Sequence, residues 1–109
     1  MKKMAVLAAC VAWSLTFAQA ADVKENWDKQ CASCHGKDGK GETKAGKKAD
    51  VKDLTDAKYQ ASFTDDQATQ QIRDGMKDKT GKERMKPFRD KLSDDEMKAL
   101  TAYVRAFKK

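Results

Sequence analysis

Residues 30–36 read QCASCHG and contain most of the cysteine and histidine side chains of the chain. The sequence has 109 residues but only three cysteines and one histidine. Two of these cysteines, Cys31 and Cys34, lie three positions apart, and the histidine, His35, follows directly. A C-x-x-C-H pattern therefore gathers the thiol and imidazole chemistry of the protein at one point of the chain.

Three kinds of site can use this pattern. A Cys31–Cys34 disulfide of the thioredoxin type would open a helix after a strand, and no segment here reads as a strand. A structural zinc ion usually takes four Cys or His ligands, one more than the pattern offers. Covalent haem attachment uses C-x-x-C-H itself, with Cys31 and Cys34 bonded to the haem vinyl groups and His35 bound to the iron. We therefore expect one covalent haem c.

The start of the chain has the pattern of a secretory signal peptide. Two lysines precede an uncharged apolar run at residues 4–17, and Ala18-Gln19-Ala20 fits the small-residue cleavage rule. A lipidated Cys10 is the weaker alternative, because the apolar run continues past it. We expect a signal peptide at 1–20, a domain at 21–109, a periplasmic location and no stable membrane insertion after cleavage.

Without those first residues the chain is small, polar and basic. It keeps 21 basic and 17 acidic side chains, a net charge of +4. A domain of this size with few large apolar side chains often needs a disulfide, a metal or a cofactor to be stable. The composition therefore favours a bound group at the C-x-x-C-H pattern.

Two long segments carry a family resemblance. QCASCHGKDGKG at residues 30–41 and MKPFRDKLSDDEMKALTAYVRAF at residues 85–107 resemble the small single-haem class I cytochromes c of the bacterial periplasmic type. The resemblance implies an all-α cytochrome c fold, with about four short helices around one covalently bound haem and crossing N- and C-terminal helices. It also implies an electron carrier that cycles between Fe(III) and Fe(II), and not an enzyme.

The resemblance extends to single positions, with one departure. Asp53-Leu54-Thr55 is similar to a family segment whose leucine packs on the haem. Relatives often carry a proline after the attachment motif, and its carbonyl accepts a hydrogen bond from the histidine ligand. The only proline here is Pro87, so the hydrogen-bond partner of His35 stays open.

Capping and spacing patterns predict four helices and one long loop. Capping boxes begin at Asp22, Thr64 and Ser93, and the last of them precedes an apolar stripe at 3–4 spacing. The expected helices run from Asp22 into the motif, from Asp56 to Ala61, from Thr64 to Gly75 and from Ser93 to the end of the chain. The glycines and lysines between Gly36 and Asp50 predict a loop.

The second axial ligand of the iron must come from elsewhere. His35 is the only histidine, which leaves a methionine, a lysine, water or no ligand. Met85 precedes Lys86-Pro87, where proline favours extended backbone, and it corresponds to the ligand position of the family. We expect Met85 to bind the iron, with Met76 as the alternative.

Residues 77–91 concentrate the positive charge. They hold seven basic and three acidic side chains, while the rest of the chain after residue 20 is balanced at 14 of each. This segment is either a solvated loop or a docking surface for an acidic redox partner. We expect the docking surface, on a monomer that binds no nucleic acid.

Two other functions compete with a free electron carrier. A haem enzyme or a gas or redox sensor would need an open sixth position on the iron, and the sequence offers no distal histidine or acid–base pair for one. An electron-transfer subunit of a larger dehydrogenase would use the same ligands with an obligate partner.

Overall fold

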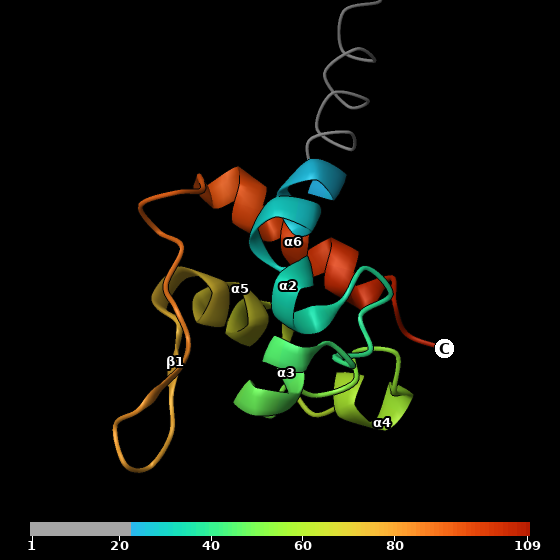
Figure 1. Cartoon of the computed structure of the whole chain (residues 1–109). Helices are drawn as coiled ribbons and strands as arrows, with labels where there is room; N and C mark the ends of the chain where they lie inside the picture. Colours follow the sequence, from blue (N-terminus) through green and yellow to red (C-terminus); the bar gives the residue numbers. More distant parts are fainter. Residues whose placement is uncertain (1–22) are drawn as a thin grey trace, which may run out of the picture.

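Short helices and one small hairpin make up residues 23–109, the part of the chain that the computed structural model describes (Figure 1). A helix over residues 23–30 comes first. The other elements follow in the order α2 (Ala32–His35), α3 (Lys44–Ala49), α4 (Ala57–Gln60), α5 (Asp65–Asp74), β1 (Met76–Lys77), β2 (Glu83–Met85) and α6 (Asp94–Arg105). The predicted signal peptide, Cys10 and the Asp22 cap lie outside the described residues. Within residues 23–109, every helix is too short or too polar to cross a bilayer.

The N-terminal helix and α6 lie against each other, and α6 crosses behind the helix in Figure 1. The Trp27 ring, only 2% exposed, packs on Tyr103 and Phe107 with ring centroids 5.3 and 5.1 Å away. The Asn26 amide also donates a hydrogen bond to the Glu96 carboxylate at 3.1 Å. The predicted contact between the terminal helices is therefore confirmed, together with a mostly helical fold.

Two capping boxes fix where the longer helices begin, as the sequence predicts. The Thr64 hydroxyl accepts from the Gln67 backbone N–H, and the Gln67 side chain accepts from the Thr64 N–H. Ser93 and Glu96 make the same reciprocal pair at the start of α6. An N-cap of this kind contributes about 1 kcal/mol. The hydrogen bonds from the Ser93 backbone and the Asn26 side chain lower the pKa of Glu96.

The predicted loop from Gly36 to Asp50 contains a helix, so this prediction is wrong for its second half. The Thr43 hydroxyl accepts from the Gly46 N–H at 2.8 Å and so caps α3. The same hydroxyl donates to the carbonyl of Ser33 at 2.7 Å. A single threonine thus caps α3 and bonds it to the attachment motif. The high glycine content of the segment predicted a loop and hid this helix.

The expectation that no segment forms a strand is also wrong. β1 and β2 pair in antiparallel fashion, with Met76 opposite Met85 and Lys77 opposite Glu83. The Asp78 N–H donates to the Lys82 carbonyl at 2.9 Å and closes the turn between them. Strands of two and three residues are too short to give the alternating pattern by which a strand is recognised.

Arg105 joins the end of α6 to the segment that runs from α4 to α5. Its guanidinium donates to the Gln60 side-chain oxygen, the Phe63 carbonyl and the Asp65 carboxylate at 2.9, 2.7 and 2.7 Å. Gln60 is itself buried, and its amide donates to the Leu54 carbonyl at 2.7 Å. These bonds hold the chain between Leu54 and Asp65 in place, where several side chains line the cavity described below.

Gly46 of α3 provides a test of the contact between α3 and the motif. A Cβ atom on Gly46 would lie 2.1 Å from the Cys34 carbonyl oxygen. We predict that Gly46→Ala lowers the free energy of unfolding by about 1–3 kcal/mol, because the backbone must shift to relieve the overlap. Urea denaturation of the mature protein measures the change. The neighbouring exposed substitution Lys47→Ala is the control, and equal stability of the two variants would contradict the prediction.

Candidate haem site

One cavity of about 150 Å³ lies between the attachment motif and the segment that follows α5. The N-terminal helix, α2, α4, α5, β2 and α6 all contribute side chains to its wall, and most of these are apolar. The lining residues are Trp27, Cys31, His35, Leu54, Tyr59, Ser62, Phe63, Gln67, Ala68, Gln71, Ile72, Met85, Leu100 and Val104. A mostly apolar wall with a few sulfur and nitrogen atoms is typical of a cofactor site.

The attachment motif continues the N-terminal helix through a turn. The Cys31 N–H donates to the Trp27 carbonyl, and the His35 N–H donates to the Cys31 carbonyl, both at 2.9 Å. These helical bonds place Cys31 and His35 on the same cavity wall. Cys34 lies one turn from Cys31, is partly exposed and is not part of the wall. Both thiols are free, so the structure contains no Cys31–Cys34 disulfide.

The imidazole of His35 is held by packing and makes no hydrogen bond within residues 23–109. Its ring lies 5.7 Å from the Trp27 ring between centroids, and the indole N–H donates to the Gly36 carbonyl at 3.1 Å. His35 Nδ1 is buried and has no hydrogen-bond partner within residues 23–109. Burial lowers the pKa of this imidazole, so it is held neutral. A neutral imidazole has a free lone pair, which is the form that binds a metal.

The thiol of Cys31 fits the same chemistry. Burial, and then the neighbouring Cys34, raise its pKa to about 12. A sulfur in this environment stays uncharged, and a thioether sulfur is also uncharged. Cys31, the neutral imidazole of His35 and the apolar wall therefore fit a covalently attached haem.

The hairpin brings Met85 to the cavity and leaves Met76 outside. Met85 is half-buried and lines the wall, whereas Met76 is 47% exposed and does not. Gly75 allows the close approach of the two segments, because a Cβ atom there would lie 2.5 Å from the Met85 carbonyl oxygen. The Phe88 N–H donates to the Ile72 carbonyl at 3.0 Å and fixes the chain beyond Met85. Of the two candidate methionines, the structure thus presents Met85 to the cavity.

These features can be set beside known proteins. A family model described as cytochrome c oxidase, cbb3-type, subunit III, matches residues 18–104 of this chain. The chain belongs to this family. It is a family of cytochrome c domains, so the chain is a c-type cytochrome, and its implied chemistry is haem-based electron transfer.

Solved structures agree with the family. The structure titled KustC0563 c-type cytochrome is 36% identical, with a TM-score of 0.71, and the match covers 79% of this chain and 96% of that one. A single-residue mutant of the same cytochrome matches with 36% identity and a TM-score of 0.69, over 80% of this chain and 99% of its own. A comparison with curated proteins gives no significant match. The implied fold of this cytochrome is therefore confirmed.

Several residues that line the cavity could not be predicted from the sequence. Gln67 and Gln71 line the cavity from α5 and are four residues apart, but glutamines resemble a solvated helix surface. Ser62 and Phe63 lie in the short connection before α5 and carry no motif. Leu54, which the family resemblance singled out, does line the cavity.

The turn of the hairpin depends on one carboxylate. Asp78 accepts from the Thr80 N–H and hydroxyl at 2.9 and 2.6 Å, from the Lys82 N–H at 3.0 Å and from Arg84 at 3.1 Å. The Thr80 hydroxyl is the largest cause of a pKa lowered to about 2. The ionised form of Asp78 is thus bound more strongly in the folded hairpin than in the unfolded chain.

We predict that the turn of this cytochrome loosens in acid. Because the pKa of Asp78 is lowered from 3.8 to about 2, its contribution is complete above pH 3.8 and is lost as the pH falls through about 2. At neutral pH, Asp78→Ala should speed hydrogen exchange at the Thr80 and Lys82 amides, as measured by NMR. Asp90→Ala, in the same basic segment, is the control. Unchanged exchange in Asp78→Ala would show that the turn does not depend on this carboxylate.

Proposed function

We propose that this cytochrome is a soluble periplasmic electron carrier with one covalent haem c, whose iron is bound by His35 and Met85. The observation that supports this most directly is the shared cavity wall, to which α2 contributes a neutral imidazole and β2 contributes a thioether. When bound, the haem supplies a one-electron Fe(III)/Fe(II) couple.

The protein side chains hold that couple in place and tune it. Cys31 and Cys34 tether the group to the start and end of one helical turn. His35 supplies a buried nitrogen, and the soft thioether of Met85 favours the reduced state. Leu54, Ile72 and Leu100 are buried and exclude water from the cavity. With both axial ligands from the chain, no open position is left for a substrate, which favours a carrier over an enzyme.

The periplasmic setting rests on the first residues of the chain. The signal pattern at residues 1–20 directs export, and haem of this type is attached outside the cytoplasm. The mature protein is then the domain at 21–109, acting as a monomer that meets its partners by diffusion.

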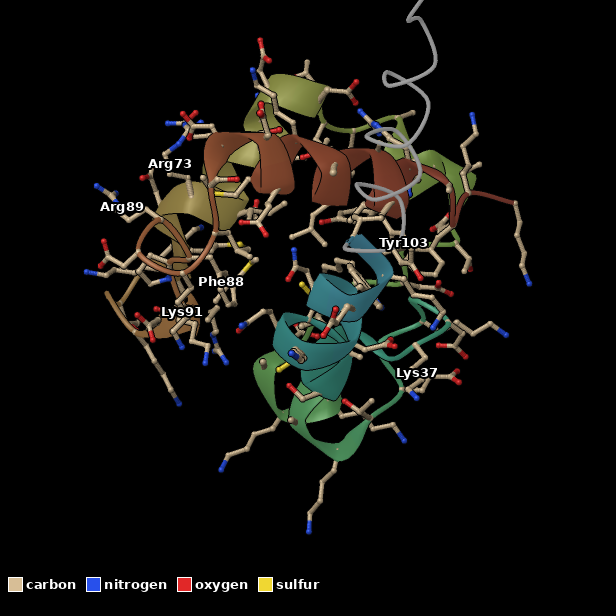
Figure 2. The ribbon with its side chains drawn as sticks, turned by 90° about the horizontal axis from the view of Figure 1, so that it is seen from above. Lys37, Arg73, Phe88, Arg89, Lys91 and Tyr103 are labelled. Atoms are coloured by element: carbon tan, nitrogen blue, oxygen red, sulfur yellow. The ribbon has the colours of Figure 1, made fainter. Side chains whose placement is uncertain are left out.

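The docking surface of this carrier is the basic segment 77–91. Its basic side chains are exposed apart from Arg84, which is partly buried against Asp78. Arg89 pairs with Asp74, and within residues 23–109 the five lysines of the segment make no ion pair. Figure 2 shows Arg89 and Lys91 pointing outward on one flank of the molecule, away from Lys37. The segment contains Met85, so an acidic partner docked there comes close to the haem.

The first test is the axial ligand. The oxidised mature protein should show the weak far-red absorption band of sulfur bound to Fe(III), and Met85→Ala should remove it because the thioether is lost. Met76→Ala is the matched control and should keep the band. If the wild type lacks the band, the sixth position is open or bound by a lysine, and the enzyme or sensor function gains support. If the band survives Met85→Ala, Met76 is the ligand.

The second test is electrostatic. Reduction of hexacyanoferrate(III), an anionic probe, should slow by several-fold from low to physiological ionic strength, because salt screens the attraction to the basic segment. The double variant Lys79→Gln with Lys82→Gln should flatten this dependence. Lys24→Gln with Lys98→Gln removes the same charge elsewhere and is the control. Equal slopes for the two double variants would contradict docking at 77–91.

A further inference from the structure

A side chain of α5 contacts the sulfur of Met85. The Gln71 amide nitrogen, Nε2, lies 3.9 Å from Met85 Sδ and points a donor at it, within the longer reach of a sulfur acceptor. Both residues line the same cavity. Gln71 is otherwise exposed and makes no other side-chain hydrogen bond within residues 23–109. The amide is therefore directed to the sulfur by the fold and not held by another partner.

The backbone around this contact is fixed at both ends. Phe88, three residues after Met85, bonds through its N–H to the carbonyl of Ile72, the residue that follows Gln71. At Gly75 the Met85 carbonyl comes so close that no side chain fits. Because the chain just beyond Met85 is bonded to α5, the backbone segments that carry the amide and the sulfur are held close together.

The contact has a chemical consequence for a ligand sulfur. A thioether has two lone pairs, so one can bind iron while the other accepts a hydrogen bond. A donor on the second lone pair draws electron density from the sulfur and makes it a weaker donor to Fe(III). It also selects one orientation of the sulfur and its methyl group.

We propose that Gln71 is the positioning residue of Met85, and that its amide raises the reduction potential by hydrogen bonding to the ligand sulfur. The proposal rests on the proposed ligation by Met85. Gln71 does not bind the iron and acts only through the sulfur. On this proposal, α5 is the element that sets how strongly the Met85 sulfur binds the iron.

Two variants of Gln71 and one of its neighbour test this proposal by equilibrium potentiometry. Gln71→Leu removes the donor, and Gln71→Asn keeps an amide but shortens the side chain beyond reach of the sulfur. Both should lower the potential. An apolar leucine alone would disfavour the charged Fe(III) form and raise the potential, so a fall in both variants is not an effect of polarity. Gln70→Leu, exposed on the same helix, should leave the potential unchanged.

An NMR measurement on the reduced protein gives a second readout that a purely structural role would not move. The methyl resonance of the ligand methionine should be single in the wild type and in Gln70→Leu, and broadened or doubled in both Gln71 variants. Suppose that the wild type shows the far-red band, while the Gln71 variants keep the wild-type potential and a single methyl resonance. This result would overturn the role of Gln71 and leave the ligation by Met85 intact. Absence of the band from the wild type would overturn the ligation and this proposal together.

Discussion

Burial of the Trp27 ring is the interaction on which the other parts of this cytochrome depend. The ring touches Tyr103 and Phe107 at the C-terminal end of the chain and His35 in the attachment motif. Its N–H group is satisfied by the Gly36 carbonyl, so the indole is buried without an unpaired donor. One side chain thereby couples the crossing of the terminal helices to the position of His35, the proposed iron ligand. A change in the packing of the terminal helices would therefore reach the His35 imidazole through this ring.

The remaining core is small for a domain of this length, and the cavity explains why. Leu54, Ile72 and Leu100 are buried and also line the cavity, so they belong to both the core and the site. A haem seated there would extend the apolar contacts of these side chains and join the attachment motif to the hairpin. Small polar domains are stabilised in this way when their own apolar side chains are too few. If haem is bound as proposed, its attachment and the folding of this chain would therefore be coupled.

Local signals predicted much of this fold because they act within a few residues. The boxes at Thr64 and Ser93 and the C-x-x-C-H motif each carry their partners within three or four positions. The helix α3 depends on Thr43 bonding back to the motif, and the clamp by Arg105 joins residues some forty positions apart. Such contacts leave no local pattern. The contact between Gln71 and Met85 could not be predicted from the sequence for the same reason, since it forms only when the hairpin folds onto α5.

The Met85 side of the site is built differently from the His35 side. On the His35 side, a single helical turn places the proposed iron ligand and Cys31, so the sequence motif is sufficient. On the Met85 side, the proposed ligand lies on a strand of three residues that would not be stable alone. It is held by the Phe88–Ile72 bond, by the close approach at Gly75 and by the turn that Asp78 closes. The same hairpin carries the exposed side chains of Lys77, Lys79 and Lys82, so the proposed docking surface and the proposed ligand share one element. A partner docked on this element, as proposed, would contact the segment that positions the Met85 sulfur.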